Sequence, residues 1–320
     1  MTRPDDSTLD PENLRAVEEQ AHRLLDRADA WDRYPVPVND ILSAARVRLA
    51  PTSAFDAASI VSYLKEKTAD AGARIKSAIS KVFGLYDAAE ALIHVDDTVV
   101  EAKQTFLKLH ETGHHDMPTH RKMFRIFQDC KKTLAPDVAD HFEREANNYA
   151  RFLLFKGPVF AQHAAGYPFE IKTPMTLART FGASVYAAAR EFARTNHRAC
   201  VVFVLEPLEN EAGCGFRAPV RRIEPSPAYL ARFGRPSVNV VTPNHPLWSV
   251  VPIGRKMTRP VPLTISDLNG QPHECLAEAF DTTYNILILL YPVTALTATT
   301  VLIPASTNST DLIRTLSAEQ

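Results

Sequence analysis

Residues 110–114 read His-Glu-Thr-Gly-His, which places two histidines four positions apart. In an α-helix of 3.6 residues per turn, positions i and i+4 lie on one face, so both imidazoles can reach one ion. Zinc binds imidazole nitrogens at about 2.0–2.1 Å. Glu111 lies at a neighbouring angle, where a general base for an activated water is needed. The pattern predicts a metal-dependent hydrolase with His110 and His114 as ligands and Glu111 as base. The alternative is a solvated helix with two surface histidines.

A catalytic zinc site needs a third protein ligand, and the segment 142–155, FEREANNYARFLLF, offers one. Residues three and four apart form one helical face, here Glu143, Ala146, Asn147, Ala150 and Leu154. We expect Glu143 to be the third ligand, and Asn147 to hold a ligand histidine through its free ring N–H. Glu145 is rotated about 200° from Glu143 on this helix and is expected to be solvated. The alternative is an amphipathic helix with surface carboxylates.

The two segments together resemble a known family. HETGH followed by EREANNYARFLLF is similar to the HExGH and ExEANxFAxxLL motifs of the ImmA/IrrE zinc metallopeptidases. The resemblance covers about residues 30–195. It implies a zincin-like fold, zinc held by His110, His114 and Glu143, and Glu111 as base. It also implies that the substrate is a transcriptional repressor, cut once in a stress or mobile-element response.

Three features depart from that family. Phe155-Lys156 stands where many members have Met-Pro. The helix-turn-helix that often accompanies the peptidase is not evident in the sequence. The chain beyond about residue 195 does not match the better known members. These departures concern the substrate and regulation and leave the predicted chemistry intact.

Several details of the predicted site follow from general chemistry. Zinc is the expected metal, with Mn²⁺ or Fe²⁺ as alternatives. Gly113 costs roughly 1 kcal/mol in a helix interior, so we expect it to permit a close approach of backbone or metal. The oxyanion of peptide hydrolysis needs a donor besides the metal. The candidates are Tyr149, which is equally a core residue, and His115 and His120.

Bulk composition favours an enzyme of the cytoplasm. A length of 320 residues suggests two domains. A net charge of −1 gives no indication of electrostatic binding to nucleic acid. The first twenty residues show no signal peptide. The cysteines lack CxxC spacing and are expected to be reduced thiols, namely Cys130, Cys200, Cys214 and Cys275.

Residues 283–303 carry no charge over about the length of a bilayer span. Pro292 interrupts the stretch and threonines recur in it, which disfavours insertion into a membrane. We therefore expect two buried strands, at 285–291 and 298–303, with a transmembrane span as the alternative.

The chain is expected to have an α+β fold in three parts. These are a disordered tail over 1–10, a mainly helical metallopeptidase domain with a small sheet over 11–195, and a smaller α/β or α+β accessory domain over 196–320. In the first domain we expect helices at 11–27, 38–45 and 56–80, and strands at 83–87 and 91–96, the latter at an edge of the cleft. In the second we expect a helix at 228–233 and strands at 200–205, 213–219, 248–253 and 261–266. Residues 273–275 are interpreted as a turn that leads into a helix.

Two other classes of function compete with the peptidase. One is a non-catalytic zinc-containing protein that binds a regulatory partner, although a purely structural site would not require Glu111. The other is a DNA-binding regulator that uses Thr173–Arg194 as a helix-turn-helix, which the near-zero net charge disfavours.

Overall fold

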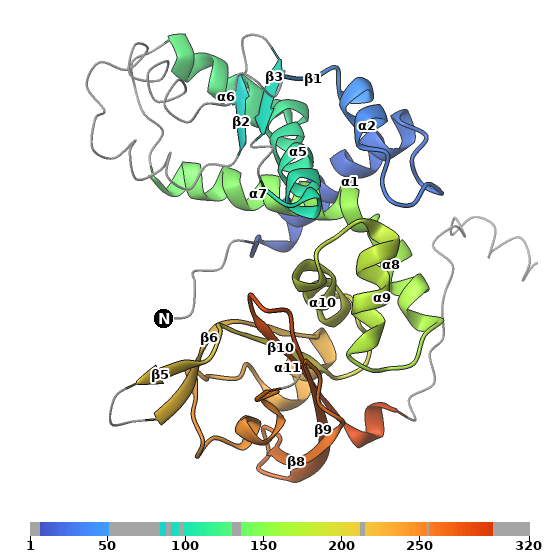
Figure 1. Ribbon diagram of the computed structural model, residues 1–320. Coiled ribbons are helices and arrows are strands. Elements are labelled where there is room, and N and C mark those ends of the chain that lie inside the picture. The colour runs from blue at the N-terminus through green and yellow to red at the C-terminus, as the bar shows by residue number, and fades with distance from the viewer. Residues whose placement is uncertain are drawn as a thin grey trace, which may run out of the picture. The chain divides into compact units, whose positions relative to one another are not determined.

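A computed structural model of the chain describes residues 7–50, 84–87, 91–95, 99–129, 136–211, 215–254 and 256–296. Helices and strands both contribute, so the class is α+β, as predicted. The chain divides into two compact units, the first chiefly 2–157 with 174–188, the second chiefly 158–173 with 189–320 (Figure 1). The second unit thus begins before residue 196, the boundary expected from the sequence, and residues 174–188 belong to the first unit. The predicted helix at 56–80 and strand at 298–303 lie outside the described residues.

Both predicted motifs lie on helices of the first unit, residues 110–114 on α5 (Glu101–Asp116) and residues 142–155 on α7 (Pro136–Phe155). α1 (Pro11–Arg27) begins at Asp10, whose carboxylate accepts hydrogen bonds from the backbone N–H groups of Glu12 and Asn13. The predicted helices at 11–27 and 38–45 are both confirmed. The other helices described between residues 28 and 157 are α2 (Val38–Ala45) and α6 (Pro118–Asp129).

A small three-stranded sheet lies beside α5 (Figure 1). Its strands are β1 (Arg48–Leu49), β2 (Gly84–Asp87) and β3 (Leu92–Val95), in the order β1-β3-β2. β3 runs parallel to β1 and antiparallel to β2. The predicted strand near residue 92 is therefore the central strand of this sheet, and β2 is an outer strand.

The second unit is built on an antiparallel sheet with strand order β5-β6-β4-β10-β9-β8, and β7 pairs with β6. The two central strands, β4 (Val201–Leu205) and β10 (Ile286–Pro292), consist entirely of buried residues. β10 lies within the uncharged stretch and confirms the predicted strand at 285–291. None of the described helices is long and apolar enough to cross a membrane.

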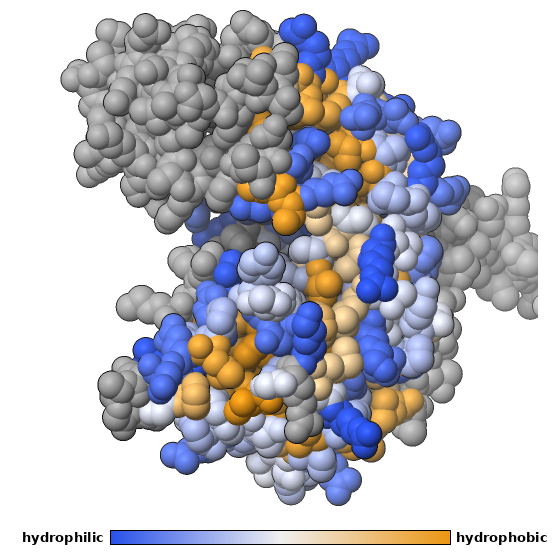
Figure 2. All heavy atoms as spheres, viewed as in Figure 1, coloured by the Kyte–Doolittle hydropathy of each residue, from blue (hydrophilic) through white to orange (hydrophobic). Residues whose placement is uncertain are grey.

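The described residues also form other strands and α-helices, several of them longer than β4 and β10. The strands are β5 (Glu209–Glu211), β6 (Gly215–Pro225), β7 (Val240–Val241), β8 (Val261–Ser266) and β9 (Pro272–Asp281). The helices are α8 (Pro158–Ala165), α9 (Lys172–Phe181), α10 (Val185–Arg194) and α11 (Pro227–Phe233). In the view of Figure 2, hydrophilic residues cover much of the described surface, with smaller hydrophobic areas between them.

Two predictions for the second unit are wrong. Half of the expected strand at 248–253 lies instead in a 3₁₀ helix over Pro246–Val250. At its start the His245 ring accepts a hydrogen bond from the backbone N–H of Leu247. The expected turn and helix at 273–275 instead lie in β9, which pairs with β8 on one side and β10 on the other. Long-range pairing overrides the helical propensity of this Ala- and Glu-containing segment.

Candidate metal centre

The C-terminal half of α5 is enclosed by other elements. Every residue from Leu109 to His115 is buried, although a helix on a protein surface normally has one solvated face. α5 contacts α7, α2 and α6 as well as strands β2 and β3. The alternative of a solvated helix with two surface histidines is therefore wrong.

The three predicted ligands come together from two helices. Nε2 of His110 lies 3.2 Å from Nε2 of His114. Oε2 of Glu143, on α7, lies 3.3 Å from Nε2 of His110, and Oε1 lies 3.4 Å from Nε2 of His114. The two imidazole nitrogens and the Glu143 carboxylate thus form a triangle of donor groups, in which each nitrogen contacts a different carboxylate oxygen.

The size of this triangle fits a tetrahedral metal ion. Bonds of about 2.0–2.1 Å at tetrahedral angles separate neighbouring ligand atoms by about 3.3–3.4 Å. The two histidine nitrogens lie 3.2 Å apart, close to this value, and one donor atom from each of the three residues lies within 4.8 Å of the others. A fourth position is left for a small molecule. The Glu143 side chain is 57% exposed whereas the histidine side chains are below 10%, so the site is reached from the Glu143 side.

The ionisation of the three groups reflects their mutual contacts. Burial alone would raise the pKa of Glu143, but hydrogen bonds from His110 and His114 hold it well below its usual value. Burial would lower the pKa of His110, but Glu143 and, more weakly, Glu111 and the Asn147 side chain raise it. Nδ1 of His110 is buried with no hydrogen-bond partner among the described residues, so the predicted hydrogen bond between Asn147 and a free ring N–H is not found on His110.

The pKa of His114 is lowered to about 4, chiefly by burial. The neighbouring His110 and His120 also lower it, whereas Glu143 raises it. His114 is therefore neutral near pH 7, the state in which imidazole binds a metal. The pKa of Glu111 is raised to about 7, chiefly by burial. The charge of Glu143 also raises it, whereas His110 lowers it. A carboxylate with this pKa can both take and return a proton near neutral pH.

Glu145 is not solvated, contrary to the prediction from its angle on the helix. Its Oε2 atom lies 2.7 Å from Nε2 of His120, and only 12% of its side chain is exposed. Nδ1 of His120 in turn lies 3.1 Å from Nδ1 of His114. The prediction failed because it considered α7 against α5 alone, whereas His120 belongs to α6. A histidine six residues after the motif was the sequence signal for this contact.

Gly113 permits a close contact between α5 and α7, as one of its two predicted roles requires. A Cβ atom at this position would lie 3.0 Å from Cδ1 of Tyr149. The Tyr149 hydroxyl donates a hydrogen bond of 2.7 Å to Asp116. Tyr149 is thus a core residue. Of the other two candidates for the oxyanion donor, His120 contacts His114 and Glu145, and His115 is buried in α5.

Lys156, where the sequence departs from the family pattern, has a structural role. It follows α7 with a positive φ of 57° and is fully buried. Its ammonium donates hydrogen bonds to the backbone carbonyl of Ala30 at 2.7 Å, that of Trp31 at 3.0 Å and that of Arg33. The Tyr34 ring lies 3.9 Å below the ammonium. Lys156 therefore ties the end of α7 to the loop after α1.

Comparison with protein-family models and with curated proteins finds no match. Among solved structures, the chain is similar to a Mycobacterium tuberculosis transcriptional regulator, with a TM-score of 0.53 and 12% sequence identity. The similarity covers 88% of this chain and 77% of the other. At this identity the similarity indicates a shared fold.

Proposed function

We propose that this protein is a zinc-dependent metalloendopeptidase with a zincin-like site on α5 and α7. One observation carries the proposal: Nε2 of His110 and Nε2 of His114 lie 3.2 Å apart, close to the spacing of ligands on tetrahedral zinc, and each contacts an oxygen of Glu143 at 3.3–3.4 Å. The small sheet beside α5 and the buried Glu111 next to these ligands also support it.

The residues have separate roles in the proposed reaction. His110, His114 and Glu143 hold the ion, which would supply Lewis acidity that polarises a peptide carbonyl and acidifies water. Glu111 accepts a proton as the water oxygen bonds to the carbonyl carbon. The C–N bond then breaks, and Glu111 returns the proton to the leaving amine.

The proposed substrate is a transcriptional repressor that is cut at a limited number of bonds. This part of the proposal depends on the resemblance of the two motifs to the ImmA/IrrE metallopeptidases. Release of a repressor from DNA by cleavage requires no contact between the peptidase and nucleic acid, which agrees with the net charge of −1.

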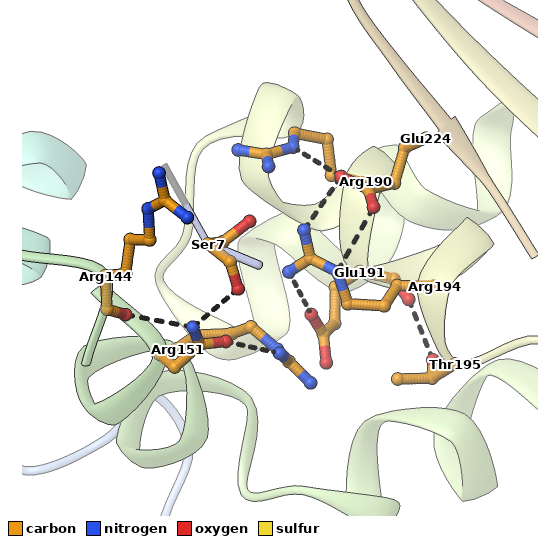
Figure 3. A network of polar contacts seen from close by, with 9 residues as sticks. Ser7, Arg144, Arg151, Arg190, Glu191, Arg194, Thr195 and Glu224 are labelled. Atoms are coloured by element: carbon orange, nitrogen blue, oxygen red, sulfur yellow. Dashed lines mark hydrogen bonds and ion pairs between the residues drawn. The ribbon is translucent and has the colours of Figure 1, made fainter. Parts of the chain in front are cut away.

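Direct DNA binding through residues 173–194 is less compatible with the described contacts. A recognition helix presents exposed side chains to the major groove, but α10 contains no exposed residue. Its two arginines bind Glu224 of β6 instead, Arg190 through Nε at 2.9 Å and Arg194 at 2.7 Å (Figure 3). Electrophoretic mobility shifts at several salt concentrations test this alternative.

The first experiment measures zinc by competition with a chromophoric chelator, using full-length protein purified without added metal. We expect one equivalent in the wild type and in Glu111→Gln, and loss of binding in His110→Ala, His114→Ala and Glu143→Ala. Glu101→Gln, an exposed carboxylate on the same helix, is the matched control. Wild-type protein that binds no zinc would overturn the proposal.

A second experiment tests catalysis with a peptide library derived from a whole proteome and mass spectrometry of new termini. Cleavage should require zinc and should fall about 10²–10⁴-fold in Glu111→Gln, as expected for the loss of a general base. If zinc binds but neither protein cleaves, the non-catalytic binding protein is the better description. If Glu111→Gln cleaves as well as wild type, Glu111 is not the general base.

A further inference from the structure

Beyond the three ligands, a chain of two polar side chains leads away from the metal centre into the first unit. We propose that Glu145 and His120 are positioning residues, which fix the His114 ring in the tautomer that presents Nε2 to the metal. This inference rests on the proposed metal site and deepens it. It assigns a function to the one carboxylate that was expected to be solvated.

The direction of the hydrogen bonds follows from what each group can donate. An ionised carboxylate only accepts, so the 2.7 Å contact between Glu145 and Nε2 of His120 requires a proton on that nitrogen. In a neutral His120 ring, Nδ1 then carries a lone pair. The 3.1 Å contact between the two Nδ1 atoms is therefore donated by His114. With its proton on Nδ1, neutral His114 has a bare Nε2 atom.

This tautomer is the one that the donor triangle needs. Nε2 of His114 is the atom that lies 3.2 Å from Nε2 of His110 and 3.4 Å from Glu143. A proton on that atom would block coordination. Ligand histidines in metalloproteins commonly donate their second ring N–H to an oriented acceptor, and loss of such a partner typically costs 10–100-fold in metal affinity. Here the acceptor is a second histidine rather than a carboxylate.

Packing holds both members of the chain in place. His120 is fully buried, and its ring stacks on Phe142 with centroids 4.1 Å apart and planes 23° apart. The other oxygen of Glu145 lies 3.4 Å from Nε2 of His141, one helical turn away. Glu145 therefore has few orientations available. Its contact with His120 fixes the orientation of the ring that contacts His114.

The test compares two substitutions of His120 in the full-length protein. His120→Phe keeps the ring and its stacking on Phe142 but provides no acceptor. His120→Gln has a carbonyl that can accept from His114 and an amide N–H that can donate to Glu145. We expect zinc affinity, measured by chelator competition, to fall 10–100-fold in His120→Phe and to stay within about threefold of wild type in His120→Gln. Circular dichroism verifies that both variants are folded.

A second readout does not require metal. Nitrogen-15 NMR of histidine-labelled, metal-free protein reports which ring nitrogen carries the proton. We expect the Nδ1–H tautomer of His114 in wild type and in His120→Gln, and an increased Nε2–H population in His120→Phe. Adding Glu145→Gln to His120→Phe should change zinc affinity little further, since the carboxylate acts through His120.

The outcomes separate this inference from the proposed function. Equal zinc affinities in wild type and His120→Phe, or an Nε2–H tautomer in wild type, would overturn the positioning role while the metal site stands. If wild type shows the expected tautomer and affinities but cleaves no peptide, the positioning role is supported and the peptidase is not. If wild type binds no zinc, the peptidase and the positioning role both fail.

Discussion

Gly113 of α5 lies directly against the ring of Tyr149 of α7, where an added Cβ would meet Cδ1 at 3.0 Å and Cγ at 3.2 Å. The ring has little room to move, because its hydroxyl is bonded to Asp116 and the residue is fully buried. The tight contact brings Glu143, six residues before Tyr149, to the level of the histidines on α5.

Gly113→Ala should therefore destabilise the protein although alanine favours helices. The gain in helix propensity is about 1 kcal/mol, and overpacking in a core typically costs about 1–3 kcal/mol. We expect a net loss of about 1 kcal/mol in chemical denaturation. In a Tyr149→Leu background the same substitution should cost less. A stabilised Gly113→Ala variant would show that propensity outweighs the contact.

Tyr149→Phe should separate a structural role from a role in oxyanion binding. The hydroxyl donates to a carboxylate that also accepts from Gln20 and pairs with Arg27. Loss of a hydrogen bond to a charged group costs about 1.5–3 kcal/mol, so unfolding free energy should fall by that amount. Zinc affinity and cleavage per folded molecule should be unchanged. A large loss of turnover in a stable variant would instead assign Tyr149 to catalysis.

Zinc affinity should decrease as the pH falls. Glu143 raises the pKa of His110 against the effect of burial, so the bound proton stabilises the metal-free fold at low pH. That contribution is lost as pH rises through the folded pKa, and zinc then competes with fewer protons. Below the ordinary imidazole pKa of about 6.5, we expect roughly tenfold weaker zinc binding per pH unit, measured by titration calorimetry in several buffers. His197→Gln, at an exposed position, should leave this dependence unaltered.

Lys156→Met should lower unfolding free energy by about 2–4 kcal/mol, because three backbone carbonyls lose their donor in a buried position. Chemical denaturation of the variant measures this loss. Lys172→Met, at an exposed position, is the control and should change stability by less than about 0.5 kcal/mol. Equal effects at the two positions would contradict a structural role for Lys156.

Glu224→Gln should remove a pH-dependent part of the stability of the second unit. Burial raises the pKa of Glu224, but Arg194 and Arg190 together lower it below its usual value. Stability from this ion pair is thus present above about pH 4.5 and is lost as pH falls through the folded pKa. We expect the variant to be about 1–3 kcal/mol less stable at pH 7, with the difference shrinking in acid. Glu209→Gln, which breaks a more exposed pair with Arg217, should have little effect.

Helical periodicity was sufficient to predict which side chains face one another across α5 and α7. It placed His110, His114 and Glu143 together, because the three lie on facing sides of two adjacent helices. It failed for Glu145, since the angle of a residue on one helix does not reveal a third helix. The position of α6, set by the turn at Met117, is a tertiary feature that a single sequence does not contain.

The second sheet shows the same limit for strands. The uncharged run of β10 was predictable because a strand buried on both faces is apolar at every position. β9 was not, because its polar residues and alanines also suit a helix, and its pairing partners are distant in sequence. The 3₁₀ helix after His245 was missed for a different reason: Pro246 begins a helical turn that is too short to have a periodicity.

The donor triangle also has a consequence for the mechanics of the first unit. Its atoms belong to two helices, and the chain between His114 and Glu143 includes all of α6. An ion bound there would act as a removable cross-link that closes this loop, much as a disulfide does. Amide hydrogens of α5 and α7 should then exchange more slowly with solvent when zinc is bound, and chelation should release both helices together.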